Sequence, residues 1–268
     1  MYPYLGAMWK CRFFWLSLVR MDLRARYRGS ALGIGWSLLN PIAMTTILCV
    51  VFRVMLQQDL RTYAPYVFTG MTFWGFFSSV LVGGCGCFFA GESYIRQFPA
   101  PMAIYPLRTV LGSAFHFTIG LLLAVVLACF LGPPESAGSS RLMQLVAIPS
   151  LIPTLLLLLL LGWSMAVLLG LLNVRFRDTH HLTEIGLQGL FYMTPIMYPD
   201  QILAGRRIGL VIQCNPLVPF LNLIREPILY GRVPSLATFG IATAIVFVVA
   251  GAAMLALRYE ERRLIFYL

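Results

Sequence analysis

Charged side chains are scarce in this chain of 268 residues, and lysine is almost absent from it. Asp, Glu, Lys and Arg together make up 11% of the residues and hydrophobic residues make up 59%, whereas a soluble domain carries about 25% charged residues. Lys10 is the one lysine, and the G-x-x-x-x-G-K-[ST] loop that cradles nucleotide phosphates is missing. The composition therefore excludes an ordinary soluble protein, and the missing loop excludes a P-loop ATPase.

No cluster of side chains with catalytic or metal-binding spacing occurs in the sequence. The six cysteines contain no Cys-x-x-Cys pair, and Cys85 and Cys87 lie in a Gly-rich stretch where small packing residues are expected. His180 and His181 are adjacent, so their side chains would project apart on a helix. We therefore expect neither a catalytic residue nor a metal site on this chain.

Long apolar runs dominate what is present. Five stretches contain no Asp, Glu, Lys or Arg and are long enough to cross a bilayer: residues 32–52, 64–90, 109–131, 145–172 and 236–257. About 20 apolar residues in a helix cover the ~30 Å of hydrocarbon. A sixth segment, 182–198, is shorter and more polar. The sequence predicts an all-α membrane protein of one domain with six transmembrane helices.

The basic residues predict how these spans are oriented. With six spans both termini share one side, and the loops on that side hold more arginines than the loops on the other. Basic loops stay in the cytoplasm, so both termini are expected there. The formal net charge of +10 then reflects topology and contact with anionic membrane lipids, and no nucleic-acid partner is expected.

Residues 9–28 are predicted to form a helix that lies on the membrane without crossing it. Leu16 and Val19 recur at helical spacing with Leu23, and Arg24 falls on the opposite face. This pattern is typical of an interface helix, and a plain membrane anchor explains it equally well.

Residues 93–101 connect the second and third predicted spans. Ser93 is placed to cap a short helix, which Pro99 and Pro101 would then stop. Such an elbow either transmits force from a soluble partner or is only a tight connection.

Residues 199–235 are predicted to hold a short helix on the outer side of the membrane. Asn215 and Pro216 are a favourable N-cap and first helical residue, and Gly231 offers the stop. The apolar side chains between them recur at helical spacing: Leu217, Phe220, Ile224 and Ile228. The helix is too short to span, so we expect a re-entrant or interfacial helix that serves as a gate.

A polar and aromatic stripe is predicted along the sixth segment, with a smaller counterpart in the first span. Its members are Glu184, Gln188, Phe191, Pro195 and Tyr198, flanked by Tyr192, with Trp36 and Asn40 in the first span. Polar stripes inside a membrane usually face protein or water, and aromatic faces suit the C–H faces of sugars. Helix packing and the aromatic belt explain Tyr192 and Tyr198 equally well.

Several blocks along the chain resemble the permease subunits of ABC-2 type polysaccharide exporters, which export O-antigen, capsule and teichoic acid. The most specific block is Arg26–Pro41, with the sequence RYRGSALGIGWSLLNP. The others are YAPY at 63–66, the elbow at 94–108, Arg177-Asp178, TPIMYP at 194–199, NPL at 215–217 and REP at 225–227. Their order and spacing match over nearly the whole chain.

The resemblance implies a homodimer in the bacterial inner membrane, docked on two ATP-binding cassette subunits that hold ATP and Mg. It implies no cofactor on this chain and a lipid-linked polysaccharide as substrate. The residues implied for the channel lining are Trp36, Asn40, Gln188, Phe191, Tyr192 and Tyr198. Those implied for coupling to the ATPase are Arg96, Phe98 and Pro99, and those for the gate are Leu217, Phe220, Ile224 and Ile228.

The lipid carrier of such a glycan bears phosphate, and arginine binds phosphate oxygens through a bidentate fork. Arg24, Arg26 and Arg28 lie where the interface helix meets the first span, so we expect them to bind the lipid phosphate. Positive-inside anchoring accounts for the same residues. Three other functions stay open: an ABC-2 exporter of teichoic acid or lipid, a secondary transporter or channel, and a membrane-embedded enzyme.

Overall fold

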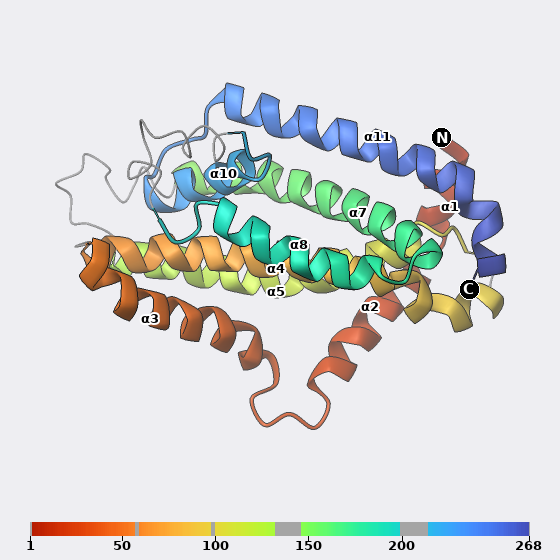
Figure 1. The fold of residues 1–268 in the computed structure, drawn as a ribbon, viewed down its shortest axis with the longest axis horizontal. Helices are drawn as coiled ribbons and strands as arrows, with labels where there is room; N and C mark the ends of the chain where they lie inside the picture. The colour runs from red at the N-terminus through yellow and green to blue at the C-terminus, as the bar shows by residue number, and fades with distance from the viewer. Residues whose placement is uncertain (1, 57–58, 98–99, 132–145, 199–213, 268) are drawn as a thin grey trace.

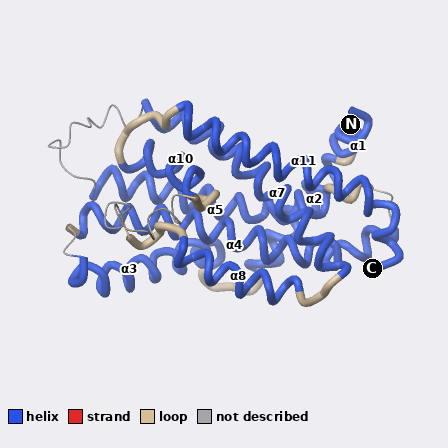
Figure 2. Tube along the Cα trace, turned by 45° about the horizontal axis from the view of Figure 1, so that its top comes forward, coloured by secondary structure: helices blue, strands red, loops and turns tan. Residues whose placement is uncertain are grey.

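The computed structural model describes residues 2–56, 59–97, 100–131, 146–198 and 214–267, and the regular elements among them are all helices (Figure 2). The elements are α1 (Tyr2–Lys10), α2 (Arg12–Tyr27), the 3-10 turn η1 (Gly33–Gly35), α3 (Trp36–Leu56), α4 (Leu60–Gln97), α5 (Ile104–Leu131), η2 (Ile148–Ser150), α7 (Leu151–Arg175), α8 (Thr179–Met193), α10 (Val218–Leu229) and α11 (Leu236–Tyr267). The all-α prediction is confirmed for these residues.

Five of the described helical stretches are long and apolar enough to cross a membrane. They are Gly33–Phe52, Leu60–Gln97, Ile104–Leu131, Ile148–Arg175 and Leu236–Glu261. They coincide with the five charge-free runs of the sequence. Two continue well beyond the apolar run, because α4 and α11 extend into polar residues at one end.

The predicted sixth span is shorter as a helix than expected. α8 has 15 residues, about 22 Å of helix, against ~30 Å of hydrocarbon. It ends at Met193, and residues 194–198 are irregular. The prediction of one helical stripe through Pro195 and Tyr198 is therefore wrong in its second half.

The first predicted helix is also divided. α1 and α2 are separated at Cys11, so residues 9–28 do not form one continuous helix. Leu18 and Val19 are buried on α2, which packs against α5. α2 is therefore attached to the helical bundle by one apolar side, while Arg20, Arg24 and Arg26 remain exposed.

α4 lies at the centre of the bundle and packs against α3, α5, α7 and α8. Small residues bring α4 and α7 close together: a Cβ on Gly84 would lie 2.7 Å from the Cα of Ala166, and one on Gly170 would lie 2.9 Å from the Sγ of Cys87. Small residues at helix interfaces are typical of membrane proteins. Cys85 and Cys87 are buried thiols in this interface, consistent with the packing role expected for them.

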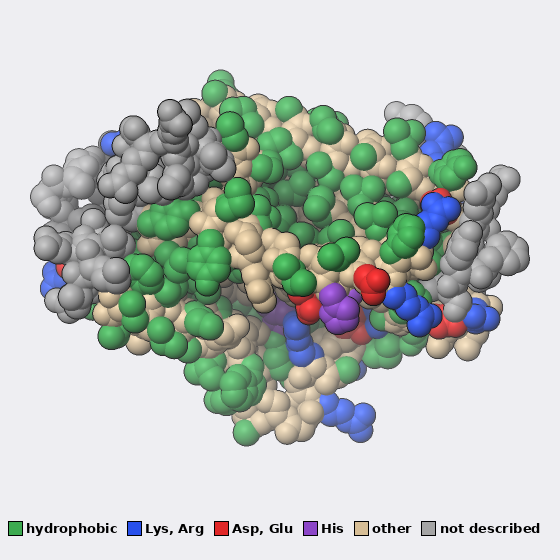
Figure 3. Space-filling model, viewed as in Figure 1, with side chains coloured by type: hydrophobic (Ala, Val, Ile, Leu, Met, Phe, Trp, Pro, Cys, Tyr) green, Lys and Arg blue, Asp and Glu red, His purple; other side chains and the backbone are tan. Residues whose placement is uncertain are grey.

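Both termini lie at the same end of the molecule (Figure 1). Five crossings alone would leave them at opposite ends. α8 starts beside the end of α7 and runs back along α4 toward the end where α10 lies (Figure 1). On the face drawn in Figure 3, most Lys and Arg side chains lie toward the end with the termini.

Candidate functional site

A sharp bend joins α2 to α3 at the start of the most specific sequence block. Gly29 and Gly33 have φ angles of 78° and 49°, a left-handed conformation that glycine adopts without steric cost. The N–H of Gly33 donates to Ser30 Oγ at 3.2 Å. α2 and α3 diverge from this bend and run to different parts of the bundle (Figure 1).

Three polar side chains tie this bend to the third span. Tyr27 ends α2, Ser37 lies in the first turn of α3, and His116 lies in α5. The Tyr27 hydroxyl is 2.6 Å from Ser37 Oγ and 2.9 Å from His116 Nδ1, and Ser37 Oγ is 2.9 Å from the same nitrogen. Each of these side chains therefore has a partner, and the bend is fixed to α5.

A polar groove runs beneath the bend, between α2, α3, α4 and α5. It consists of two adjoining cavities of ≈ 360 and ≈ 560 Å³, which share Arg26, Ser79, Ser113 and His116 in their walls. These volumes fall within the roughly 300–1,000 Å³ of small-molecule sites. Gly75 and Gly112 lie in the walls, and a Cβ on either would meet no atom within 4 Å. The groove therefore has hydroxyls, the guanidinium groups of Arg26 and Arg108, and open space along two spans.

The structure distributes the three predicted phosphate-binding arginines over two places. Arg26 lines the groove. Arg24 and Arg28 line a separate hollow on α2 together with Arg20. All four side chains are exposed, and none forms an ion pair with another described residue. They are charged groups open to a ligand, but Arg26 is not part of one cluster with the others.

The predicted channel residues fall on two sides of α4. Trp36 and Asn40 line the groove from α3. On α8, Gln188 and Tyr192 are exposed, and the Phe191 ring packs at 5.3 Å from that of Trp74 on α4. Both helices that carry these residues pack against α4. The exposed residues of α3 and α8 therefore flank the groove without forming one continuous stripe.

Residues 194–198, which we name the strap, carry the chain onward after α8 ends. Residues 194–197 are buried and non-helical. The Tyr63 hydroxyl donates to the carbonyl of Met197 at 2.7 Å, and the Tyr66 hydroxyl lies 3.2 Å from the carbonyl of Pro195 and 3.0 Å from that of Tyr198. Irregular backbone at membrane depth is tolerated where protein satisfies its polar groups, and these tyrosines do so.

Arg225 holds the strap together with Tyr66. Its side chain is only 3% exposed. Nη1 donates to the carbonyl of Pro195 at 2.7 Å and Nη2 to that of Ile196 at 3.1 Å, and the guanidinium lies 3.7 Å from the centre of the Tyr66 ring. Gly70 makes room for it, because a Cβ there would lie 2.7 Å from Nη2.

The face predicted to act as a gate belongs to the core of the chain. Leu217, Phe220, Ile224 and Ile228 are between 0% and 4% exposed and pack with α4, α5, α7 and α11. α10 begins at Val218. The helical spacing was correct, but these side chains stabilise the subunit and do not line an open surface of it.

The Asn215 side chain does not cap α10 as predicted. Its Oδ1 accepts from the N–H of Leu217 at 2.9 Å, while its amide donates to Thr194 Oγ1 at 3.0 Å. Leu217 takes the N-cap position of the helix. Asn215 therefore connects the start of α10 to the strap.

The elbow is the end of α4 and not a separate helix. α4 continues to Gln97, so Ser93 lies inside it and caps nothing. Arg96 forms an exposed ion pair with Glu92, with a separation of 2.9 Å. Phe98 and Pro99 lie outside the described residues.

Two hydrogen bonds attach the far side of the elbow to other helices. Trp163 of α7 donates from Nε1 to the carbonyl of Ala103 at 3.1 Å. The N–H of Met102 donates to Glu261 Oε1 of α11 at 3.3 Å. The chain between α4 and α5 is therefore held by both α7 and α11.

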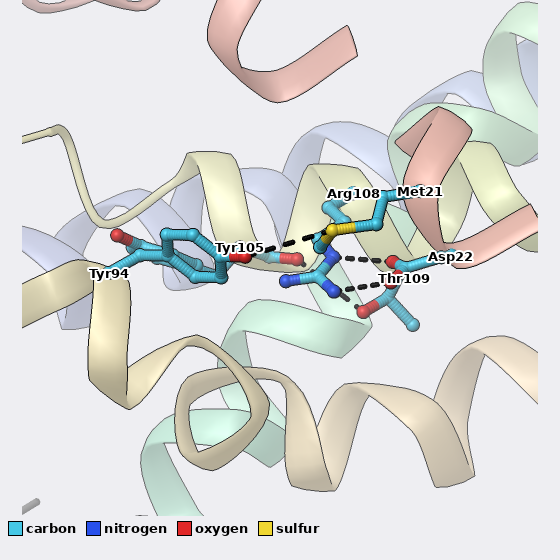
Figure 4. A network of polar contacts seen from close by, with 6 residues as sticks. All are labelled: Met21, Asp22, Tyr94, Tyr105, Arg108 and Thr109. Carbon is cyan, nitrogen blue, oxygen red and sulfur yellow. Dashed lines mark hydrogen bonds and ion pairs between the residues drawn. The ribbon is translucent and has the colours of Figure 1, made fainter. Parts of the chain in front are cut away.

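α2 is bound to both flanks of the elbow (Figure 4). Asp22 accepts two hydrogen bonds from Arg108 near the start of α5. At the end of α4, the Tyr94 hydroxyl donates to Met21 Sδ at 3.8 Å, and its ring meets that of Phe14 edge-on at 6.0 Å. A displacement of the elbow would thus reach α2 directly.

Comparison with known proteins decides the family. The model of the ABC-2 type transporter family matches residues 14–229, which is most of the chain. The chain belongs to the ABC-2 type transporter family.

Curated ABC-2 relatives cover most of this chain at low identity. An O-antigen export system permease protein RfbA from Klebsiella pneumoniae is 26% identical over 214 residues, which is 80% of this chain and 79% of the relative. RfbA of Myxococcus xanthus is 26% identical over 228 residues, or 85% and 84%. The polysialic acid transport protein KpsM of Escherichia coli is 21% identical over 220 residues, or 81% of each chain.

Two sets of hydrogen bonds hold this ABC-2 chain together, one at the bend between α2 and α3 and one at the strap. The residues that form them were not among the predicted site residues. Tyr27 and Ser37 lie in the first sequence block, and Tyr66 and Arg225 lie in two later ones. Only the resemblance pointed to them, since none follows a helical periodicity. His116 had a weaker signal: it is the one titratable imidazole within an apolar run.

Proposed function

We propose that this chain is the channel-forming membrane subunit of an ATP-driven exporter of lipid-linked polysaccharide, O-antigen or capsule, in the bacterial inner membrane. It would act as a homodimer with two ATP-binding cassette subunits, which hold ATP and Mg. The names of the RfbA and KpsM relatives support this substrate class. The observation that carries the proposal is the polar groove with glycines in its walls, which follows two helices long enough to cross a membrane.

In this proposal α8 and the strap together form a sixth crossing. The helix covers about 22 Å, and the irregular residues of the strap continue the chain beyond it. The position of both termini at one end of the molecule (Figure 1) supports an even number of crossings. The basic side chains toward that end favour a cytoplasmic location for it.

We assign the exposed arginines of α2 to the lipid phosphate. Arg20, Arg24 and Arg28 share one hollow, and Arg26 opens on the groove beside it. A pyrophosphate-bearing headgroup could be held on the first three while the first sugars lie toward Arg26. The elbow, with Arg96 on its surface, is the proposed docking point for the ATPase.

ATP dependence separates this proposal from a secondary transporter. The purified chain alone should hydrolyse no ATP, because it lacks a phosphate-binding loop. The complex with its cassette subunit should hydrolyse ATP and restore surface polysaccharide to a strain lacking this chain. A catalytically inactive cassette subunit is the control. Export that continues with the inactive cassette subunit would contradict the proposal. Export of teichoic acid or free lipid instead of polysaccharide would contradict the proposed substrate but not the ATP dependence.

A further inference from the structure

A crevice lies between α7 and α11, on a part of the chain that the export groove does not involve. It has a volume of ≈ 600 Å³, and its walls are almost entirely aliphatic: Leu168, Leu171, Leu172, Leu255 and Leu264. α7 and α11 run side by side (Figure 1), and both are long and apolar enough to cross a membrane. An apolar crevice between two such helices suits a hydrocarbon chain.

The crevice has a charged rim at the end where both helices reach polar residues. Arg175 ends α7, and its Nη1 lies 3.6 Å from Glu260 Oε1 of α11. This separation is longer than the 2.7–3.2 Å of a hydrogen bond. Each group is thus attracted to the other but keeps its own hydrogen-bonding capacity. Tyr259, which is 67% exposed, lies beside them at the rim, where aromatic side chains favour the membrane interface.

We propose that this crevice binds one phospholipid whose headgroup carries a primary ammonium, such as phosphatidylethanolamine. An acyl chain would fill the aliphatic crevice, the phosphate would accept hydrogen bonds from Arg175, and the ammonium would donate to Glu260. The pair of opposite charges matches the two charges of that headgroup in sign and order.

The rim argues against the other common headgroups. Phosphatidylglycerol brings a phosphate and neutral hydroxyls but no cation, so Glu260 would gain a hydrogen bond from it without an opposite charge. Phosphatidylcholine carries a cation without an N–H, so Glu260 would gain charge attraction but no hydrogen bond. The site therefore distinguishes lipids by the amine and not by charge alone.

Native mass spectrometry of the purified full chain tests the site with defined lipids. The chain is titrated with phosphatidylethanolamine, phosphatidylglycerol or phosphatidylcholine of identical acyl chains, and bound lipid is counted. One phosphatidylethanolamine should be retained in preference to the others by about five-fold, the factor expected for one added charge contact at a membrane surface. E260Q should remove this preference, and R175Q should weaken retention of all three lipids.

Arg258→Gln is the matched control, because Arg258 is an exposed arginine of the same helix that does not line the crevice. It should bind lipid as the unaltered chain does. Leu255→Trp places a larger side chain at an exposed position of the wall and should displace the lipid without altering either charge. Equal retention of the three lipids by the unaltered chain, or a preference that survives E260Q, would overturn the proposal.

Discussion

Replacing Gly75 with phenylalanine is expected to reduce export to background while leaving the protein folded. Gly75 lies in the wall of the groove, and a Cβ there meets no atom within 4 Å. The first atom of the new side chain therefore meets no neighbour, and the ring would occupy space in the groove. Glycine in a helix interior is itself unfavourable by about 0.5–1 kcal/mol relative to alanine, so the substitution need not lower stability. Surface polysaccharide in a complemented deletion strain is the readout.

Gly251→Phe is the control for this substitution. Gly251 also lies in a predicted span, and a Cβ added there would likewise meet no atom within 4 Å, but it is on α11 and outside the groove. Export should be unchanged. Both variants should be checked for dimer formation and ATPase binding by size-exclusion chromatography. A Gly75→Phe complex that assembles and exports normally would show that polysaccharide does not pass along this groove.

Arg225→Leu is expected to produce the largest loss of stability in the chain. The substitution leaves the buried carbonyl of Ile196 without its donor and removes the charged donor of the Pro195 carbonyl, which keeps only the Tyr66 hydroxyl. An unsatisfied buried polar group costs about 1–3 kcal/mol and a hydrogen bond to a charged group contributes about 1.5–3 kcal/mol, so a loss of about 3–5 kcal/mol is expected. Arg225→Lys keeps the charge but loses the planar fork, and should give an intermediate loss. Thermal inactivation in detergent measures both.

Arg232→Leu provides the comparison, because Arg232 is an exposed arginine a few residues further along. An exposed substitution of this kind usually changes stability by no more than about 0.5 kcal/mol. If Arg225→Leu were as stable as Arg232→Leu, the strap would not depend on the guanidinium. Export activity should fall with Arg225→Leu even at temperatures where the protein remains folded, because a loosened strap frees the end of α8.

The sequence was sufficient to predict those helices that are defined by apolar length and periodicity. The five charge-free runs appear as the five span-length helices, because a run of ~20 apolar residues has few other stable arrangements. The end of α8 could not be predicted in the same way. It depends on donors from Tyr63, Tyr66 and Arg225, which are distant from it in the sequence.

The site was predicted less well, for two different reasons. The spacing of Arg24, Arg26 and Arg28 is enough to show that they do not form one cluster. Side chains two residues apart on a helix point about 200° away from each other, so Arg26 cannot share a face with the other two. The apolar face of α10 was predicted correctly as a face. Periodicity does not say what covers such a face, and the chain's own core covers it.

Photocrosslinking of the substrate tests the central claim most directly. The host's polysaccharide is prepared with a small diazirine on its sugars, bound to the chain reconstituted with its ATPase, irradiated and mapped by mass spectrometry. We expect adducts on the groove walls of α4 and α5, around Gly75–Ser79 and Ser113–His116. Adducts confined to the outer surfaces of α7 and α11, or none on α4 and α5, would contradict a path along this groove.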